Sequence, residues 1–337
     1  MMLSISRLKI KRILLGLFLI SMSLVVVENA SAEMETSISF NNGYRADELD
    51  WNIAGDTEGR NPNVLSELTW EDLKIYQVKT EGDILLNWFF MRASFGYGWI
   101  LSGKNQDSDF SGDNRTEEFS RSNNNSSNGN VFDGSIGAGY QFKPGTKRFR
   151  ITPLVGYSVN EQNLSLTDGF QTIPSTGAFE NLDSTYDTKW KGPWVGVDLS
   201  VEATAAITLF GSVEYHWADY EAEANWNLRD DLAHPVSFKH SADGNGLVVS
   251  AGGTFALNKH WFVNANVNFI DWSTDPGTDQ TFTVSETVTD DDTTDDDTTD
   301  DTTDTTTTTT STDSAFSSLN EVNWNSFSIM LGVTYRF

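Results

Sequence analysis

The sequence predicts an all-β protein, a ten-stranded antiparallel transmembrane β-barrel. Three observations support this fold class: apolar and polar residues alternate in ten segments, charges of both signs stand on the polar faces, and short connections alternate with long ones. A soluble sandwich also buries one apolar face, but charges of both signs on the other face fit a polar lumen inside a lipid-facing wall. Because lipid cannot satisfy an open sheet edge, the strands must close into a barrel.

The composition excludes several other classes. The 337 residues include 48 Asp and Glu against 22 Lys and Arg, a net charge of -26, and there is no cysteine. Disulfide scaffolds, thiolate metal sites and cysteine nucleophiles are therefore excluded. The acidic excess argues against nucleic acid as a partner, because phosphate binding depends on Lys and Arg.

Residues 1–32 have the pattern of a secretory signal peptide. Four basic residues, the last of them Arg12, precede the largely apolar run 13–27, and Ala30-Ser31-Ala32 has the small side chains of a cleavage site. The apolar run is short for a bilayer span, so we expect cleavage rather than a retained anchor. The expected organisation is a signal peptide at 1–32 followed by one outer-membrane β-barrel at 33–337.

Each predicted strand has an apolar face and a polar face. In the last segment Phe327, Ile329 and Leu331 share one face, while Ser326 and Ser328 share the other. An even number of strands allows the barrel to close with both ends on one side. The ten expected strands are 35–44, 73–85, 89–99, 132–142, 151–159, 195–201, 207–217, 247–255, 261–269 and 327–337.

The connections between these strands orient the barrel. Short connections recur at 86–88, 143–148, 204–207 and 257–260, and short turns belong to the periplasmic side. The long loops are therefore expected outside the cell. Aromatic residues should gather at both membrane interfaces. Trp261 and Phe142 lie beside short turns, and the loop-side girdle is expected to contain Trp99, Tyr157, Trp217 and Trp272.

Residues 290–313 form a segment of distinct composition, with Asp and Thr in blocks and no apolar residue. Such a segment cannot form a core, so we expect a disordered, solvated loop insert. The segment lacks the Gly turn and the spaced ligands of a calcium-binding loop.

Several short motifs, in their order along the chain, resemble the family named for the Protochlamydia outer-membrane protein. They are Ser66-Glu67-Leu68-Thr69-Trp70, Gly112-Asp113-Asn114-Arg115, Leu166-Thr167-Asp168-Gly169, Tyr186-Asp187-Thr188-Lys189-Trp190, Gly192-Pro193-Trp194 and Asn323-Trp324. The resemblance implies a bacterial outer-membrane barrel with porin-like or unassigned roles. It implies no catalytic residues.

A second motif resembles the omptins, a family of ten-stranded outer-membrane proteases with an Asp pair facing an Asp-His dyad. Asp107-Ser108-Asp109 is similar to the Asp-x-Asp of that family in spacing and order. A water between the carboxylates and the His could attack a peptide carbonyl, with the His as general base. The region 218–226, where the resemblance would place Asp-x-His, contains no His.

Two substitutes for the missing dyad can be named. Asp231 and His234 lie in the corresponding loop, three residues apart. Glu214 and His216 have the same-face spacing of a strand, but they lie roughly 20 Å lower than the Asp pair at ~3.3 Å per residue. We therefore expect Glu214 and His216 to form a hydrogen-bond network in the lumen.

The interpretation that follows is a bacterial outer-membrane β-barrel of omptin-like architecture that acts at the cell surface without proteolytic activity. One alternative is an omptin-like endopeptidase that uses Asp107, Asp109, Asp231 and His234, and others are a porin and an adhesin. No cofactor and no metal are expected. The expected partners are outer-membrane lipid, lipopolysaccharide and the outer-membrane assembly machinery, which would read the aromatic terminal strand, and no nucleic acid is expected.

Overall fold

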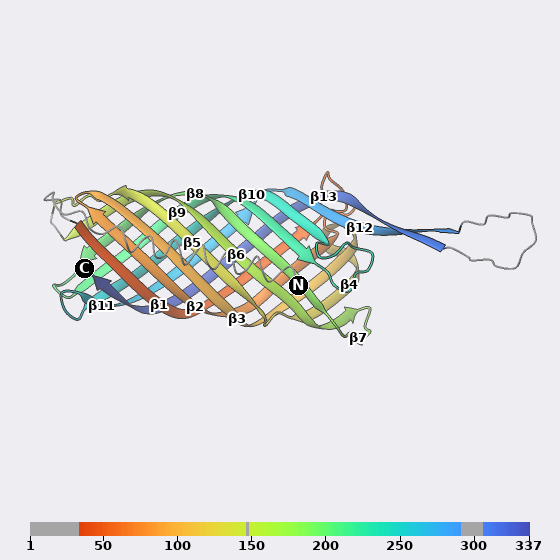
Figure 1. Cartoon of the computed structure of the whole chain (residues 1–337), viewed down its shortest axis with the longest axis horizontal. Helices are drawn as coiled ribbons and strands as arrows, with labels where there is room; N and C mark the ends of the chain where they lie inside the picture. The colour runs from red at the N-terminus through yellow and green to blue at the C-terminus, as the bar shows by residue number, and fades with distance from the viewer. Residues whose placement is uncertain (1–33, 146–147, 291–305) are drawn as a thin grey trace, which may run out of the picture. The chain divides into compact units, whose positions relative to one another are not determined.

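The strands form one antiparallel sheet that closes on itself (Figure 1). The computed structural model describes residues 34–145, 148–290 and 306–337, so the predicted signal peptide at 1–32 lies outside the described residues. β1 pairs with β13 from Ser37 opposite Arg336 to Ile53 opposite Leu319, which closes the ring. The elements are β1 Met34–Ile53, β2 Ser66–Leu86, β3 Phe89–Gly112, the 3-10 turn η1 Asp113–Arg115, β4 Thr116–Asn125, β5 Gly129–Tyr140, β6 Phe149–Ile173, β7 Gly177–Ala178, β8 Asp183–Glu202, β9 Ile207–Asn225, β10 Phe238–Ala256, β11 Trp261–Thr274, β12 Gly277–Asp290 and β13 Thr306–Arg336.

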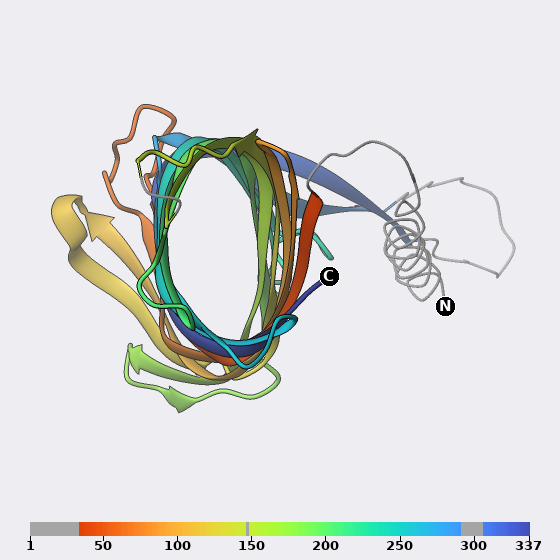
Figure 2. The same cartoon turned by 90° about the vertical axis from the view of Figure 1, so that its left-hand side faces the viewer.

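Ten strands make up the ring at the end that carries the short turns. Their order is β1, β2, β3, β5, β6, β8, β9, β10, β11 and β13. At the other end β4 replaces β5 between β3 and β6, and β12 replaces β11 between β10 and β13. Figure 2 shows the ring from the end, with the hairpins around β4 and β7 bent away from it. The predicted ten-stranded antiparallel architecture is confirmed.

The apolar faces of the strands point outward, which is the reverse of a soluble fold. On β13, Phe327, Ile329 and Leu331 are 44%, 48% and 60% exposed, whereas Ser326 and Ser328 are 4% and 6% exposed. Water does not favour such an arrangement, but lipid does, because a membrane barrel turns its apolar side chains toward hydrocarbon. The alternation predicted from sequence is therefore present with the apolar side outside.

The strands continue well beyond the predicted segments. β6 has 25 residues and β8 has 20, about twice the ~10 residues that a tilted strand needs to cross hydrocarbon. Much of the sequence expected in long loops therefore lies in paired strands, where ladder hydrogen bonds satisfy the backbone of polar residues. The same holds for part of the predicted insert 290–313: Asp290 pairs with Thr306 in the β12–β13 hairpin, and residues 291–305 lie outside the described residues.

Two bands of exposed aromatic side chains border the apolar wall. Trp88, Tyr140, Phe142, Trp261 and Phe337 lie near the short turns, and Tyr76, Trp99, Tyr157 and Trp217 lie further along the strands. Trp272, expected in the second band, is instead 2% exposed and points inward. Its even number on β11 explains this, because Trp261, Val263 and the other odd residues face the lipid.

The core lies inside the barrel, toward the end away from the short turns. Seven large aromatic side chains, which we call the aromatic layer, fill the lumen there, and each is at most 2% exposed. They are Trp51, Trp70, Tyr186, Trp190, Tyr220, Trp272 and Trp324. Neighbouring rings lie close together, for example Trp190 and Tyr220 with centroids 4.5 Å apart. In the described part of the chain no helix is long and apolar enough to cross a membrane.

Candidate functional site

The mouth of the barrel, beyond the aromatic layer, carries Asp107 and Asp109 on its inner face. Both lie on β3, past the exposed Trp99 of the aromatic band. Asn105 pairs with Trp70, which is buried inside the barrel. Directly paired residues share a face, and so do residues two apart on a strand, so Asp107 and Asp109 point inward as well. The Asp-x-Asp spacing thus brings two carboxyl groups together at the mouth.

The environment of this pair favours its protonated forms. Burial and the neighbouring charge of Asp109 raise the pKa of Asp107 well above the ordinary Asp range, while a hydrogen bond from Trp226 and the charge of Arg229 oppose this shift. Burial also raises the pKa of Asp109, against hydrogen bonds from Ser66 and Ser120. The pair therefore releases its protons in coupled steps.

The connection 226–237 between β9 and β10 faces the Asp pair. Trp226 packs on Phe238 with ring centroids 4.8 Å apart, and its backbone N–H donates to Ser237 Oγ at 2.9 Å. Arg229 donates two hydrogen bonds to the carboxylate of Asp231, at 2.8 and 2.7 Å. This ion pair lowers the pKa of Asp231. The predicted Asp231 is thus present in the mouth, but its partner is an arginine.

His234 does not complete a dyad with Asp231. Its Nδ1 lies 2.8 Å from Asn225 Oδ1, and no described hydrogen bond or ion pair joins it to Asp107, Asp109 or Asp231. The three other His residues have partners elsewhere: His216 contacts Glu214, His240 contacts Tyr186, and His260 contacts the backbone oxygen of Arg336. The arrangement therefore offers a carboxyl pair with a guanidinium and an indole beside it, without an oriented imidazole.

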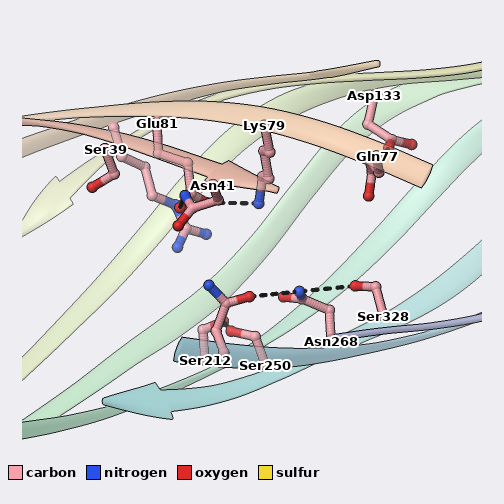
Figure 3. A network of polar contacts seen from close by, with 12 residues as sticks. Ser39, Asn41, Gln77, Lys79, Glu81, Asp133, Ser212, Ser250, Asn268 and Ser328 are labelled. Atoms are coloured by element: carbon pink, nitrogen blue, oxygen red, sulfur yellow. Dashed lines mark hydrogen bonds and ion pairs between the residues drawn. The ribbon is translucent and has the colours of Figure 1, made fainter. Parts of the chain in front are cut away.

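The lumen below the aromatic layer contains the expected polar network. His216 lies 3.0 Å from Glu214 through Nε2 and 3.0 Å from Ser158 Oγ through Nδ1. Arg92 donates to Asp198 at 2.9 Å and also to Glu214. Figure 3 shows a further part of this network on the barrel wall. The Glu214-x-His216 pair is thus on the inner wall, away from the mouth.

No metal centre is apparent at either place. Within the ranges that the structure describes, no group of three or more His, Asp or Glu side chains is arranged to hold a metal ion.

Sequence reasoning missed Trp226 and Arg229, the two residues that face the Asp pair. No local pattern marks them, because their place depends on how one connection folds across the mouth. The aromatic layer was also missed, although a signal exists. Trp324 stands at an even position of β13, opposite in parity to the apolar row that includes Phe327, and so has to point inward.

Comparison with known proteins agrees with this architecture. The model of the Protochlamydia outer membrane protein family matches residues 39–337, nearly the whole barrel. The chain belongs to this family. It is an outer-membrane β-barrel protein, as the sequence predicted, and the family match spans all ten strands of the ring.

Solved structures extend the comparison beyond this family. The outer membrane protease OmpT from Escherichia coli has a TM-score of 0.65 at 12% identity, with 92% of this chain and 99% of that chain covered. This likeness confirms the predicted omptin-like fold. The transport unit of the autotransporter AIDA-I from Escherichia coli covers 94% of both chains at 10% identity, with a TM-score of only 0.37. No curated protein sequence matches the chain.

Proposed function

We propose that this family member is a surface barrel that binds basic peptide segments at its acidic mouth and does not cleave them. The observation that carries the proposal is the composition of the mouth: Asp107 and Asp109 face Trp226 and Arg229, and no His contacts the pair. With Asp231 and Glu118, the mouth has four carboxyl groups against the guanidinium groups of Arg229 and Arg121, and a bound cation would favour the ionised forms of the Asp pair. A basic segment complements such a surface in charge.

Hydrolysis of the omptin type uses an oriented imidazole as its base, and the mouth lacks one. A positioned general base contributes about 10²–10⁴-fold to such reactions, and no described hydrogen bond or ion pair places an imidazole beside the Asp pair. OmpT is a protease, and its fold is similar to this chain. We propose that this chain differs from a protease of that fold in lacking the oriented imidazole, because the carboxyl pair is present.

The aromatic layer supports a role at the outer face rather than passage through the barrel. Seven buried rings fill the lumen between the mouth and the polar network below. A pore would need these rings to move apart, and their mutual packing opposes that. The orientation follows from the short turns, which place the mouth outside the cell.

The decisive experiment measures binding and cleavage on the same sample. Purified barrel, reconstituted with lipopolysaccharide, is mixed with labelled peptides rich in Arg and Lys and with acidic peptides of equal length. We expect saturable, salt-sensitive binding of the basic peptides alone, and intact peptide by mass spectrometry. Asp107→Ala and Asp109→Ala should weaken binding, whereas Asp113→Ala, at an exposed position of the same region, should not.

Robust cleavage that is lost in Asp107→Ala, Asp109→Ala and His234→Ala would sink this proposal and establish an endopeptidase. Equal binding of basic and acidic peptides would exclude the charge-based recognition that we describe.

Two further proposals concern export and assembly. The composition of 1–32 supports removal of a signal peptide, which N-terminal sequencing of the membrane protein tests. β13 supports a role in assembly, since it pairs with both β1 and β11 to close the ring. Deleting 335–337 should prevent insertion by the assembly machinery, and a heat-modifiable barrel in the membrane after that deletion would contradict this.

A further inference from the structure

The lumen holds a second candidate binding place, separate from the mouth. A polar cavity of about 430 Å³ lies on the side of the aromatic layer that faces the short turns. Its lining runs from Trp272 and His216 to Glu35 and Arg336, at the two ends of the ring closure. The aromatic layer closes it toward the mouth. A ligand would therefore enter from the turn end, which is the periplasmic side.

One wall of the cavity is charged, and its cations are held in ion pairs. Arg45 donates to Asp47 and Asp133 at 2.7 Å, and Lys79 lies 2.6 Å from Glu81. Arg92 holds Asp198 and Glu214, and Arg150 holds Glu202 at 2.6 Å. Each of these four cations already has a carboxylate partner. The fifth cation of the described lining, Arg336, lies exposed at the turn end over the Phe262 ring, so the deeper part of the wall offers no unpaired cation to an anionic ligand.

The facing wall is uncharged and carries hydroxyl and amide groups (Figure 3). Ser212 and Ser250 share a hydrogen bond of 2.6 Å, and Asn268 donates to Ser328 at 3.1 Å. Groups of this kind both donate and accept hydrogen bonds, so they suit a ligand that does the same.

Several buried acceptors in the lining receive no hydrogen bond from the described residues. They are Asn264 Oδ1, Gln141 Oε1 and Asp133 Oδ1, while Arg150 Nε is a donor in the same condition. Asn264 is only 5% exposed, and its amide nitrogen already donates to Thr334 at 3.0 Å. Leaving a buried acceptor unpaired is costly, so a ligand whose donors reach these oxygens after small side-chain movements would gain binding free energy.

We propose that this cavity binds a small uncharged polyhydroxyl compound, a sugar or polyol, from the periplasmic side. Hydroxyl groups supply donors to the unpaired oxygens and accept from Arg150 and the serines. The volume falls in the usual range of ligand pockets, ~300–1,000 Å³. This binding place is independent of the peptide-binding mouth, because the aromatic layer lies between them.

Titration calorimetry of the folded barrel in detergent tests the proposal. Sorbitol, glucose and sucrose should give saturable heats, whereas putrescine and gluconate should not. Asn264→Leu removes the buried acceptor and should weaken binding at least about tenfold, the equivalent of one good hydrogen bond. Asn125→Leu, on the outer side of β4, is the control and should leave the affinity unchanged.

A single cysteine then locates the ligand, since the chain has none of its own. Ser328→Cys should react with a maleimide more slowly when sucrose is present, whereas Thr116→Cys, at an exposed position of β4, should react at the same rate.

If Asn264→Leu fails to give a heat-modifiable barrel, Ser250→Ala takes its place. No saturable heat with any of the three compounds would mean that water alone occupies the cavity, and this outcome overturns the proposal. Three other outcomes would also overturn it: tighter binding of putrescine or gluconate than of the sugars, an unchanged affinity in Asn264→Leu, and an unchanged maleimide rate at Ser328→Cys in sucrose.

Discussion

At the scale of single residues, Arg229 is the group that most distinguishes this mouth. Its Nε and Nη2, which form one edge of the guanidinium, donate to Asp231, and its charge extends to Asp107 and Asp109. A guanidinium remains protonated at any pH of interest, so it can neutralise carboxylates but cannot accept a proton from water. Arg229 therefore gives the mouth a fixed positive charge and cannot act there as a base.

The raised pKa of Asp107 gives a pH dependence with a definite sign. A carboxyl group whose pKa is raised on folding stabilises the folded state at low pH, and that stabilisation is lost as pH rises through the folded pKa. Asp107→Asn should therefore raise the free energy of unfolding at pH 9, on the order of 1 kcal/mol or more because the carboxyl group is buried. At pH 4 or below the variant and the natural protein should be alike.

Urea unfolding of the barrel in detergent at both pH values measures this difference. Asp113→Asn serves as the control, because Asp113 is exposed, and should change neither value. A loss of stability at pH 9 in Asp107→Asn would show that the ionised carboxylate is stabilising instead.

At the scale of elements, the connection 226–237 is fastened to β12. Ala233 N–H donates to Phe282 O, Val284 N–H to Asp231 O and Phe282 N–H to Ser237 O, each at 2.9 Å. Leu232 and Thr283 form an antiparallel bridge between these bonds. The segment that carries Trp226 and Arg229 is thus held against the β12–β13 hairpin by three backbone hydrogen bonds and one isolated bridge.

Val284→Pro should release this segment, because proline has no N–H to donate to Asp231. We expect Trp226 to become more accessible to acrylamide quenching while the unfolding midpoint of the ring stays the same. Val288→Pro is the matched control, because residue 288 lies on the same strand with the same parity but beyond the hydrogen bonds that join β12 to 226–237. Equal quenching in both variants would exclude the role of β12 in holding the mouth.

Sequence pattern predicted the lipid-facing part of each strand and missed the part above it. Within the membrane, lipid on one side and a polar lumen on the other impose strict alternation, and the segment ending in Trp99 shows it clearly. Beyond the membrane both faces can be polar, so Asn123 and Asn124 look like a loop although they pair with β3. The Asp pair could be predicted from the Asp-x-Asp spacing in the sequence. Its partners could not, because Arg229 reaches it only through the tertiary path of 226–237.

At the scale of the whole barrel, the aromatic layer divides the lumen into two compartments. The mouth lies on one side and the polar cavity on the other, and both depend on the same rings for closure. Trp190 contributes to this division through contacts with Tyr220, Trp272 and Trp324. Indole packing of this kind is rigid and apolar, which suits a barrier to water and ions.

Planar-bilayer recording should therefore find no steady conductance in the natural protein. Replacing Trp190 and Trp324 by Ala removes two large side chains, each worth about 3–5 kcal/mol of packing, and should give discrete openings. Trp217→Ala, on the lipid-facing side, controls for the loss of an indole and should stay silent. Steady conductance in the natural protein would mean that the aromatic layer does not close the lumen.

The length of the strands has a consequence for the ionic surroundings of the mouth. β8 has 20 residues. At ~3.3 Å per residue and a tilt of ~40°, such a strand rises roughly 50 Å, against about 25 Å for the hydrocarbon band. The acidic mouth therefore stands some two to three Debye lengths above the bilayer at physiological salt, where the Debye length is about 8 Å. Fields from lipid phosphates fade over that height, so changing the head groups of the membrane should leave the attraction of a basic peptide to the mouth unaltered, whereas changing the salt should not.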